Sequence, residues 1–251
     1  IYVYNGGDLT VDDCKATGKI TRTTKDTNGG GVVVAKNSKF TLNGGSISGN
    51  GINRNGQTYY TIGGGVYVNN STFTMTGGKI SDNKAFSGGG VYLINAQFIM
   101  SGGIITGNDI TANGGGVYNV SNSTLQVSGS AQITGNTNDS AANNILSSGG
   151  EVIVDGTLNV DAALGISTYY YGDIDNGTPL TITENVNAAS AACFTSDKSN
   201  YKLKLYGDTL MLTNGKDHTH HVCGAATCTD HGEKVEWMPV GSESALNTAL
   251  S

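Results

Sequence analysis

The sequence feature that most constrains the fold is a Gly-Gly-Gly tripeptide that occurs four times, each time followed by a short apolar segment. The four copies start at Gly29, Gly63, Gly88 and Gly114, so the intervals are 34, 25 and 26 residues. Internal repetition with a period of about 20–50 residues is typical of solenoid proteins and repeat arrays. The repeat therefore predicts stacked, similar units, a type of fold that can carry many functions.

Each repeat contains a second apolar segment, which ends in a Gly-Gly turn (Gly129-Ser130 in the fourth repeat), and a third that is centred on an isoleucine. An asparagine follows each isoleucine three residues later: Asn50, Asn83, Asn108 and Asn136. Alternation of apolar and polar residues predicts strands with one buried face. The sequence therefore predicts an all-β fold, a right-handed parallel β-helix with three short strands per coil. In this fold Val66, Val91 and Val117 lie above one another, and the asparagines form a structural ladder.

Weaker β patterns extend the solenoid in both directions. Residues 1–20 have the pattern of a first coil without its glycine entry, and alternation continues through Leu180–Thr183 and Leu210–Leu212. We therefore predict one β-helix domain over residues 1–214, with about eight coils spaced about 4.8 Å apart. The chain has no initiator methionine and no signal peptide, which indicates a mature or trimmed segment.

Composition argues against two classes of partner. The net charge is −6, and no cluster of lysine and arginine could neutralise phosphates, so nucleic-acid binding is not expected. No apolar run reaches 18 residues, so membrane insertion is not expected. Charged residues make up only 14% of the chain, which leaves asparagine, threonine and serine to form the polar surface, as suits β turns and ladders.

Residues 215–240 lack β periodicity and are predicted to form a linker outside the solenoid. They contain all four histidines and two of the four cysteines: His218, His220, His221, Cys223, Cys228 and His231. Cysteine and histidine at short intervals are ligands for structural zinc. Three interpretations remain open: a zinc ion bound by both cysteines and two histidines, a Cys223–Cys228 disulfide, or a reduced linker without metal.

The other two cysteines, Cys14 and Cys193, fall in coils that are predicted to lie about seven coils apart. A disulfide requires Cα atoms within about 7 Å. Both cysteines are therefore predicted to be free, and we expect both to be largely buried.

The repeat also resembles a known kind of protein. Residues 63–68 (Gly-Gly-Gly-Val-Tyr-Val) and 73–83 (Phe-Thr-Met-Thr-Gly-Gly-Lys-Ile-Ser-Asp-Asn) resemble the right-handed β-helix repeats of large cell-surface proteins of gut Firmicutes. Residues 194–212 are similar to the final coil of that family, and residues 218–237 to the Cys/His cassette between its modules. That cassette usually has cysteine where this chain has His221.

The resemblance implies an adhesin-like, extracellular protein, at the cell surface or secreted, from a Gram-positive bacterium. It implies as partners glycans or host surface proteins, together with neighbouring modules of the same polypeptide. It also implies that residues 241–251 begin another module.

The β-helix is also a scaffold of carbohydrate-active enzymes, and glycoside hydrolysis uses two carboxylates that face one groove. Asp82 and Asp109 have no carboxylate at the equivalent position of a neighbouring coil. Asp173 and Asp175, near Tyr170, form the only acidic and aromatic cluster, in a segment predicted to be a solvated turn. We therefore predict no catalytic residue and a stalk or adhesin-like module. A polysaccharide lyase or glycoside hydrolase remains the alternative.

Three tyrosines alternate with buried positions in the first strand of successive repeats: Tyr67, Tyr92 and Tyr118. They are predicted to point outward and to stack in a row. An exposed aromatic row could bind sugar rings, or it could be a self-stacking ladder worth about 0.5–1.5 kcal/mol per pair. Together with Tyr170, Asp173 and Asp175, these tyrosines are the candidate ligand-binding residues.

Overall fold

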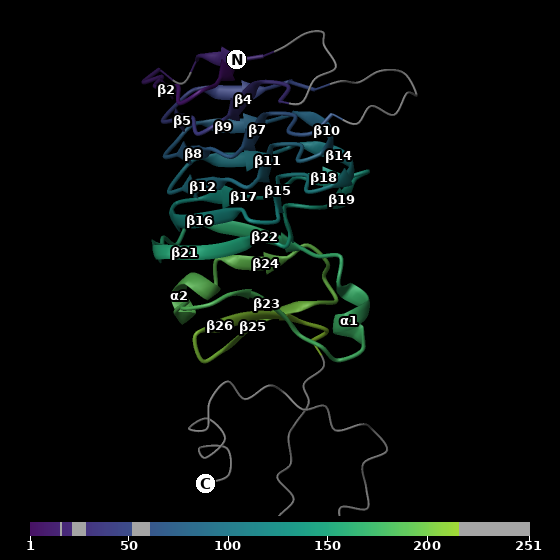
Figure 1. Cartoon of the computed structure of the whole chain (residues 1–251). Coiled ribbons are helices and arrows are strands. Elements are labelled where there is room, and N and C mark those ends of the chain that lie inside the picture. The colour runs from purple at the N-terminus through teal and green to yellow at the C-terminus, as the bar shows by residue number, and fades with distance from the viewer. Residues whose placement is uncertain (16, 22–28, 52–60, 216–251) are drawn as a thin grey trace, which may run out of the picture. The chain divides into compact units, whose positions relative to one another are not determined.

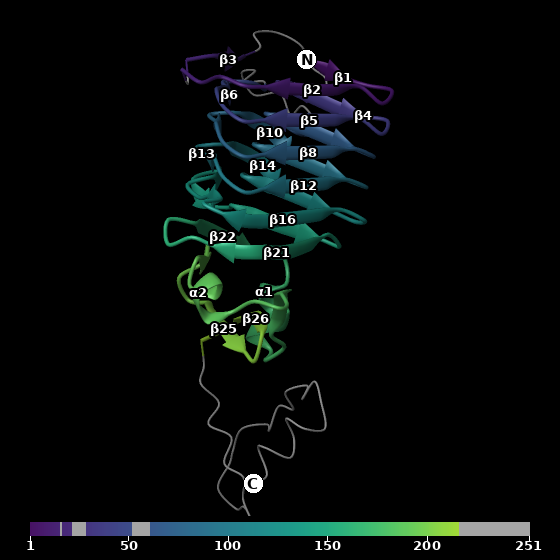
Figure 2. The ribbon, with the colours of Figure 1, turned by 90° about the vertical axis from the view of Figure 1, so that its left-hand side faces the viewer.

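The computed structural model describes residues 1–15, 17–21, 29–51 and 61–215. Contacts group residues 1–214 into one unit, which is a parallel β-solenoid of about six coils closed by a small cap (Figures 1 and 2). The predicted fold class is confirmed. Among the described residues, no helix is long and apolar enough to cross a membrane.

Each coil contributes one strand to each of three columns. The first column contains β1 (Tyr2–Val3), β4 (Val32–Ala35), β7 (Val66–Asn69), β11 (Val91–Ile94), β15 (Val117–Val120) and β20 (Ile145–Ser148). The second contains β2 (Asp8–Val11), β5 (Lys39–Leu42), β8 (Thr72–Met75), β12 (Gln97–Met100), β16 (Thr124–Gly129) and β21 (Glu151–Leu158). The third contains β3 (Lys19–Ile20), β6 (Ser46–Ser48), β9 (Lys79–Ser81), β13 (Ile104–Thr106), β17 (Gln132–Ile133) and β22 (Ala163–Ser167).

The register places like residues on like. Val91 pairs with Val66 on one side and with Val117 on the other, as predicted. The last strand of the third column, β22, also pairs with β20, which joins the first and third columns into one sheet. β24 (Phe194–Ser196) pairs with β22 and is the thirteenth strand of this sheet. A separate, smaller sheet on the side of coils three to five contains β10 (Lys84–Ser87), β14 (Asp109–Asn113), β18 (Thr137–Asn138) and β19 (Ala141–Ala142).

The core of the solenoid is a stack of identical or similar apolar side chains. The rings of Phe40 and Phe73 lie 5.1 Å apart and those of Phe73 and Phe98 lie 4.5 Å apart, both pairs nearly parallel. All three phenylalanines are fully buried. Burying a side chain of this size contributes about 1.5–3 kcal/mol, so the repeated pattern of apolar residues both sets the register and stabilises the stack.

After β22 the chain leaves the solenoid and forms the cap. The cap contains α1 (Tyr171–Asp175), β23 (Leu180–Thr183), α2 (Ala188–Ala191), β24 (Phe194–Ser196), β25 (Lys202–Tyr206) and β26 (Thr209–Thr213). β24 still pairs in parallel with β22, but β23, β26 and β25 form an antiparallel sheet. These cap strands were predicted to be further coils, so the solenoid has about six coils and not eight. The cap strands alternate like solenoid strands but lack the glycine entry and the isoleucine–asparagine spacing that set a parallel register.

Two further expectations need correction. Cys14 and Cys193 are free, as predicted, but Cys14 is exposed and Cys193 is only partly buried. Cys14 lies in the turn after β2, and the Sγ atom of Cys193 lies 3.4 Å from the Asn159 carbonyl oxygen at the edge of the cap. Asp173 and Asp175 lie in the short helix α1, not in a loop.

Candidate functional site

The predicted tyrosine row is present on the outer side of the first column. Tyr92 pairs in register with Tyr67 and with Tyr118. The ring centroids of Tyr67 and Tyr92 lie 5.7 Å apart, and those of Tyr92 and Tyr118 lie 5.4 Å apart in an edge-on arrangement. The three side chains are half-buried, so each ring is partly held by its neighbours and partly open to solvent.

A fourth tyrosine, which the sequence pattern did not assign to the row, extends it. The hydroxyl of Tyr169 donates a hydrogen bond to the hydroxyl of Tyr118 at 3.3 Å, and Tyr169 is 47% exposed. In the first column Leu146 is the register partner of Tyr118, so the repeat itself ends the row there. Tyr169 comes from the segment after β22, which no repeat pattern could have placed beside Tyr118.

Two phenols of the row, those of Tyr92 and Tyr169, hold their protons more tightly than a free tyrosine does. Burial, followed by the neighbouring Tyr118 and Tyr67, raises the pKa of the Tyr92 phenol. Burial and the hydrogen bond with Tyr118 raise the pKa of the Tyr169 phenol. The hydroxyl of Tyr67 accepts a hydrogen bond from the Nδ2 atom of Asn69 at 3.1 Å. The row therefore offers aromatic faces and hydroxyl groups.

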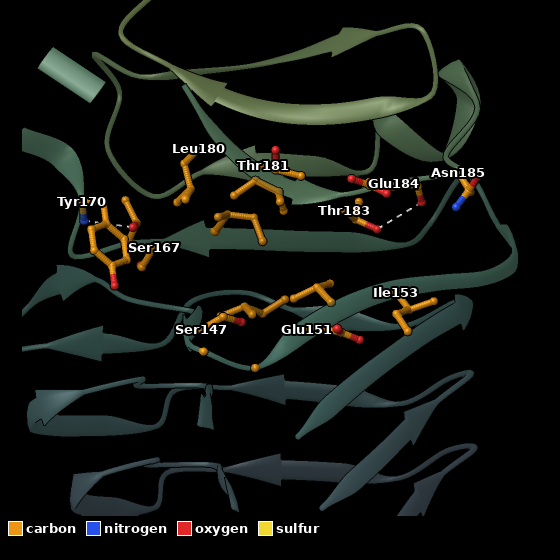
Figure 3. A pocket seen from close by; sticks show the side chains of 17 residues that line it. Ser147, Glu151, Ile153, Ser167, Tyr170, Leu180, Thr181, Thr183, Glu184 and Asn185 are labelled. Carbon is orange, nitrogen blue, oxygen red and sulfur yellow. Dashed lines mark hydrogen bonds between the residues drawn. The ribbon is translucent and has the colours of Figure 1, made fainter. Parts of the chain in front are cut away.

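A cleft of about 540 Å³ lies where the last coil meets the cap (Figure 3). Tyr170 and Ser167 lie at one end of it, and Glu184 and Asn185 at the other. Residues of β20 and β21 form one wall and residues of β23 the opposite wall. The lining residues are Ile145, Ser147, Gly149, Gly150, Glu151, Val152, Ile153, Ile166, Ser167, Thr168, Tyr170, Leu180, Thr181, Ile182, Thr183, Glu184 and Asn185.

The acidic candidates do not enter this cleft. Asp173 is exposed on α1, and Asp175 accepts a hydrogen bond from the Tyr201 hydroxyl at 2.8 Å. Neither residue lines the cleft, whereas Tyr170 does. Of these three candidates only Tyr170 lines the cavity. Glu151 and Glu184, which also line it, were not predicted, because they lie in segments that are far apart in the sequence.

The asparagine ladder is confirmed as a structural feature. The Nδ2 atom of Asn50 donates to the Oδ1 atom of Asn83 at 2.9 Å, and the link repeats from Asn83 to Asn108 and from Asn108 to Asn136. Asn83, Asn108 and Asn136 are fully buried. The side chains of Asn83, Asn108 and Asn136 are hydrogen-bonded within the stack, so they are not available to a ligand.

The ladder is longer than predicted. Asn136 donates to Asn144 at 3.0 Å, and Asn144 donates through its backbone and its side chain to the carboxylate of Asp197. The same carboxylate accepts a hydrogen bond from the Ser167 hydroxyl. The sequence did not predict Asn144 as a member of the ladder, because Asn144 does not follow an isoleucine by three residues. It takes the place of the third glycine of the tripeptide and lies beside Gly116 of the preceding coil.

The predicted metal ligands lie outside the described residues: His218, His220, His221, Cys223, Cys228 and His231. The structural zinc, the Cys223–Cys228 disulfide and the metal-free linker all remain predictions. Within residues 1–15, 17–21, 29–51 and 61–215, no group of three or more histidine, cysteine, aspartate or glutamate side chains could hold a metal ion.

Comparisons with protein-family models, with curated proteins and with solved structures give no significant match. Two features of the described residues could bind a ligand. One is the row of four tyrosines on the outside of the first column. The other is the polar cleft beside the cap. The chain is thus assigned to a fold, the parallel β-solenoid, and not to a family.

Proposed function

We propose that this chain is a non-enzymatic module of an extracellular surface protein, with a stalk or adhesin-like role, that binds glycans along the tyrosine row. The observation that carries the proposal is the row itself. Tyr67, Tyr92, Tyr118 and Tyr169 present partly open rings at close spacing along the stack of coils. Aromatic rings offer a large apolar face together with a polar hydroxyl, which suits the C–H faces and hydroxyl groups of sugars.

Host surface proteins are a second class of partner that suits this role. Neighbouring modules of the same polypeptide would hold the solenoid away from the cell wall of a Gram-positive bacterium. The continuous packing of the described unit supports a presenting role. Its core is continuous from coil to coil, and its buried polar row is hydrogen-bonded throughout the interior coils.

The proposal is tested by screening the purified chain on a glycan array, followed by Tyr92→Ala, which removes the central ring. We expect binding to a glycan with at least tenfold loss in the variant, because Tyr92 contacts both of its neighbours. Tyr206→Ala, a half-buried tyrosine on β25 outside the row, is the matched control. Circular dichroism confirms that each variant is folded. Array binding that Tyr92→Ala leaves unchanged would exclude the row as the glycan site.

A carbohydrate-active enzyme is the second candidate, and one observation favours it. Glu151 and Glu184 lie on opposite walls of the cleft (Figure 3), and glycoside hydrolases use a pair of carboxylates. Incubation of the chain with pectins and mucin glycans tests this candidate. Cleavage that is lost in Glu151→Gln or Glu184→Gln would replace the non-enzymatic proposal.

A further inference from the structure

We propose that the cleft between the last coil and the cap is a separate binding site for a single neutral sugar unit. This inference goes beyond the tyrosine row and does not depend on it. The cleft uses different residues, of which Thr168 and Tyr170 are adjacent in sequence to a member of the row, Tyr169. Its volume of about 540 Å³ is within the range of about 300–1,000 Å³ that is usual for small-molecule sites.

The cleft exists because two sheets meet without pairing. β21 is the last strand of the six-stranded second column, and β23 pairs with β26 in the cap sheet. No hydrogen bonds between β21 and β23 join the two sheets. The walls are therefore separated by side chains, and the edge of β21 that faces the cap leaves backbone polar groups available to a ligand.

The polar groups of the cleft suit hydroxyl donors. The carboxylates of Glu151 and Glu184 are exposed and, among the described residues, take part in no hydrogen bond or ion pair. The hydroxyl of Thr181 on β23 is likewise exposed and unengaged within this part of the chain. Carboxylates are strong acceptors, and a sugar hydroxyl can donate to them.

The apolar groups of the cleft suit the C–H faces of a sugar ring. Ile153, Leu180 and Ile182 are partly exposed in the cleft wall, and Tyr170 is 48% exposed at its end. A ligand that had only hydroxyl groups on every side would leave this surface unmatched. A pyranose ring has both kinds of surface, which is the combination that these walls present.

The charge of the cleft selects against anions. Its lining contains two glutamates and no lysine, arginine or histidine. An acidic sugar would bring a third carboxylate beside Glu151 and Glu184 with no cation to balance it, and like charges at short range repel. The site therefore favours a neutral unit over its uronic acid.

The core beneath the cleft also departs from the solenoid pattern. The inward residues Val68 and Leu93 are followed in register by Asn119 and then Ser147. Asn119 is fully buried, and its Nδ2 atom donates to the Glu151 carbonyl oxygen at 2.7 Å. A buried amide at this position is less stabilising than the leucine or valine that the equivalent position holds in earlier coils. Here it fixes the start of β21, the segment that carries Glu151.

The test uses calorimetric titration of the chain with methyl glycosides of glucose, galactose, mannose, fucose, N-acetylglucosamine and N-acetylgalactosamine, with methyl glucuronide as the matched anion. We expect at least one neutral glycoside to bind with a Kd of about 1 mM and methyl glucuronide to bind at least tenfold more weakly. Thr181→Trp, which fills the cleft from an exposed position, should abolish binding. Glu184→Gln should weaken binding at least threefold.

Two matched controls are available. Asp8→Asn changes an exposed carboxylate on β2, and Tyr206→Ala changes a half-buried tyrosine on β25. Both residues lie outside the cleft and outside the tyrosine row, so neither variant should alter the titration. The inference is overturned if no neutral glycoside binds, if methyl glucuronide binds as tightly, or if Thr181→Trp retains full affinity. Since the tyrosine row is tested by Tyr92→Ala on the glycan array, failure here leaves the proposed function standing.

Discussion

At the scale of single residues, the glycine tripeptide serves two different needs. Gly88, the first glycine of its copy, has a φ of 64°, a left-handed conformation that favours glycine. Gly90, the third, lacks space: a Cβ atom there would lie 2.5 Å from the Gly116 carbonyl oxygen and 2.8 Å from the Cγ2 atom of Ile105. It would also lie 3.1 Å from the Nδ2 atom of Asn108. The third glycine therefore makes room for the isoleucine and the ladder asparagine of its own coil.

We expect Gly90→Ala to destabilise the solenoid by about 1–3 kcal/mol, the usual cost of overpacking a core. A Cβ atom in this position meets backbone of the next coil, which cannot move without disturbing the stack. Urea unfolding followed by circular dichroism measures the effect. Gly172→Ala on α1, where a Cβ atom would meet nothing within 4 Å, is the control and should not lower the midpoint. Equal midpoints for Gly90→Ala and the unchanged chain would contradict this account.

The residues of the repeat could be assigned from the sequence because each copy constrains the next. The ladder from Asn50 to Asn136 and the row from Tyr67 to Tyr118 follow directly from register, since a fixed spacing places equivalent residues one above another. Tyr169 and Asp197 could not be found in this way. Each belongs to a segment without a repeat, and only the path of the chain through the cap brings it to the end of a row.

At the scale of elements, the strands of the cap could be predicted from the sequence, but their pairing could not. Alternating residues in β23, β25 and β26 predict strands, but the same alternation suits a parallel coil and an antiparallel sheet. The helix α1 has five residues, too few for a helical period to appear in the sequence. The cleft was not predicted because it depends on how β23 is oriented against β21, and no local pattern encodes that orientation.

The cap is held by a cluster around α1. The ring of Tyr171 lies 4.5 Å from that of Tyr201, and the Nζ atom of Lys198 lies 3.7 Å from the centre of the Tyr171 ring. Burial is the main cause that raises the pKa of the Tyr171 phenol to about 12. In the unfolded chain this phenol ionises near its ordinary pKa of 10.0.

This shift predicts a loss of stability in alkali. Because the folded state holds the Tyr171 proton more tightly than the unfolded state, stability is fully present below pH 10 and is lost as the pH rises from 10 towards 12. Tyr171→Phe cannot ionise, so we expect its urea midpoint to fall less than that of the unchanged chain between pH 9 and pH 11. The exposed Tyr2→Phe serves as control. An equal fall in Tyr171→Phe would mean that the phenol is not held in the cap as described.

At the scale of the whole unit, stability is approximately a sum over neighbouring coils, as in other solenoids. The repeat predicted this architecture and its register. The predicted number of coils was too high, because the alternating residues of the cap strands also predict further coils of the solenoid. Coils three to five have a neighbour on each side, whereas β1, β2 and β3 are each paired on one side only within the described part of the chain.

Amide hydrogen exchange should therefore follow position in the stack. We expect the slowest exchange in β8, β11 and β12, whose backbone groups are bonded on both sides, and faster exchange in β1, β2 and β3. Mass spectrometry of peptic fragments measures both sets in one experiment. Uniform protection from the first coil to the fifth would contradict nearest-neighbour stability and would favour a single cooperative unit.

The direction of the asparagine ladder governs how such a solenoid can vary in length. Every interior link is the same, with an amide in one coil donating to an amide in the next. A whole coil can thus be gained or lost between Asn50 and Asn136 without creating a new kind of junction. Asp197 accepts from Asn144 but, as a carboxylate, has no proton to donate onward. The ladder therefore ends at Asp197: coils can be added or removed within the stack, but the ladder cannot continue past the cap.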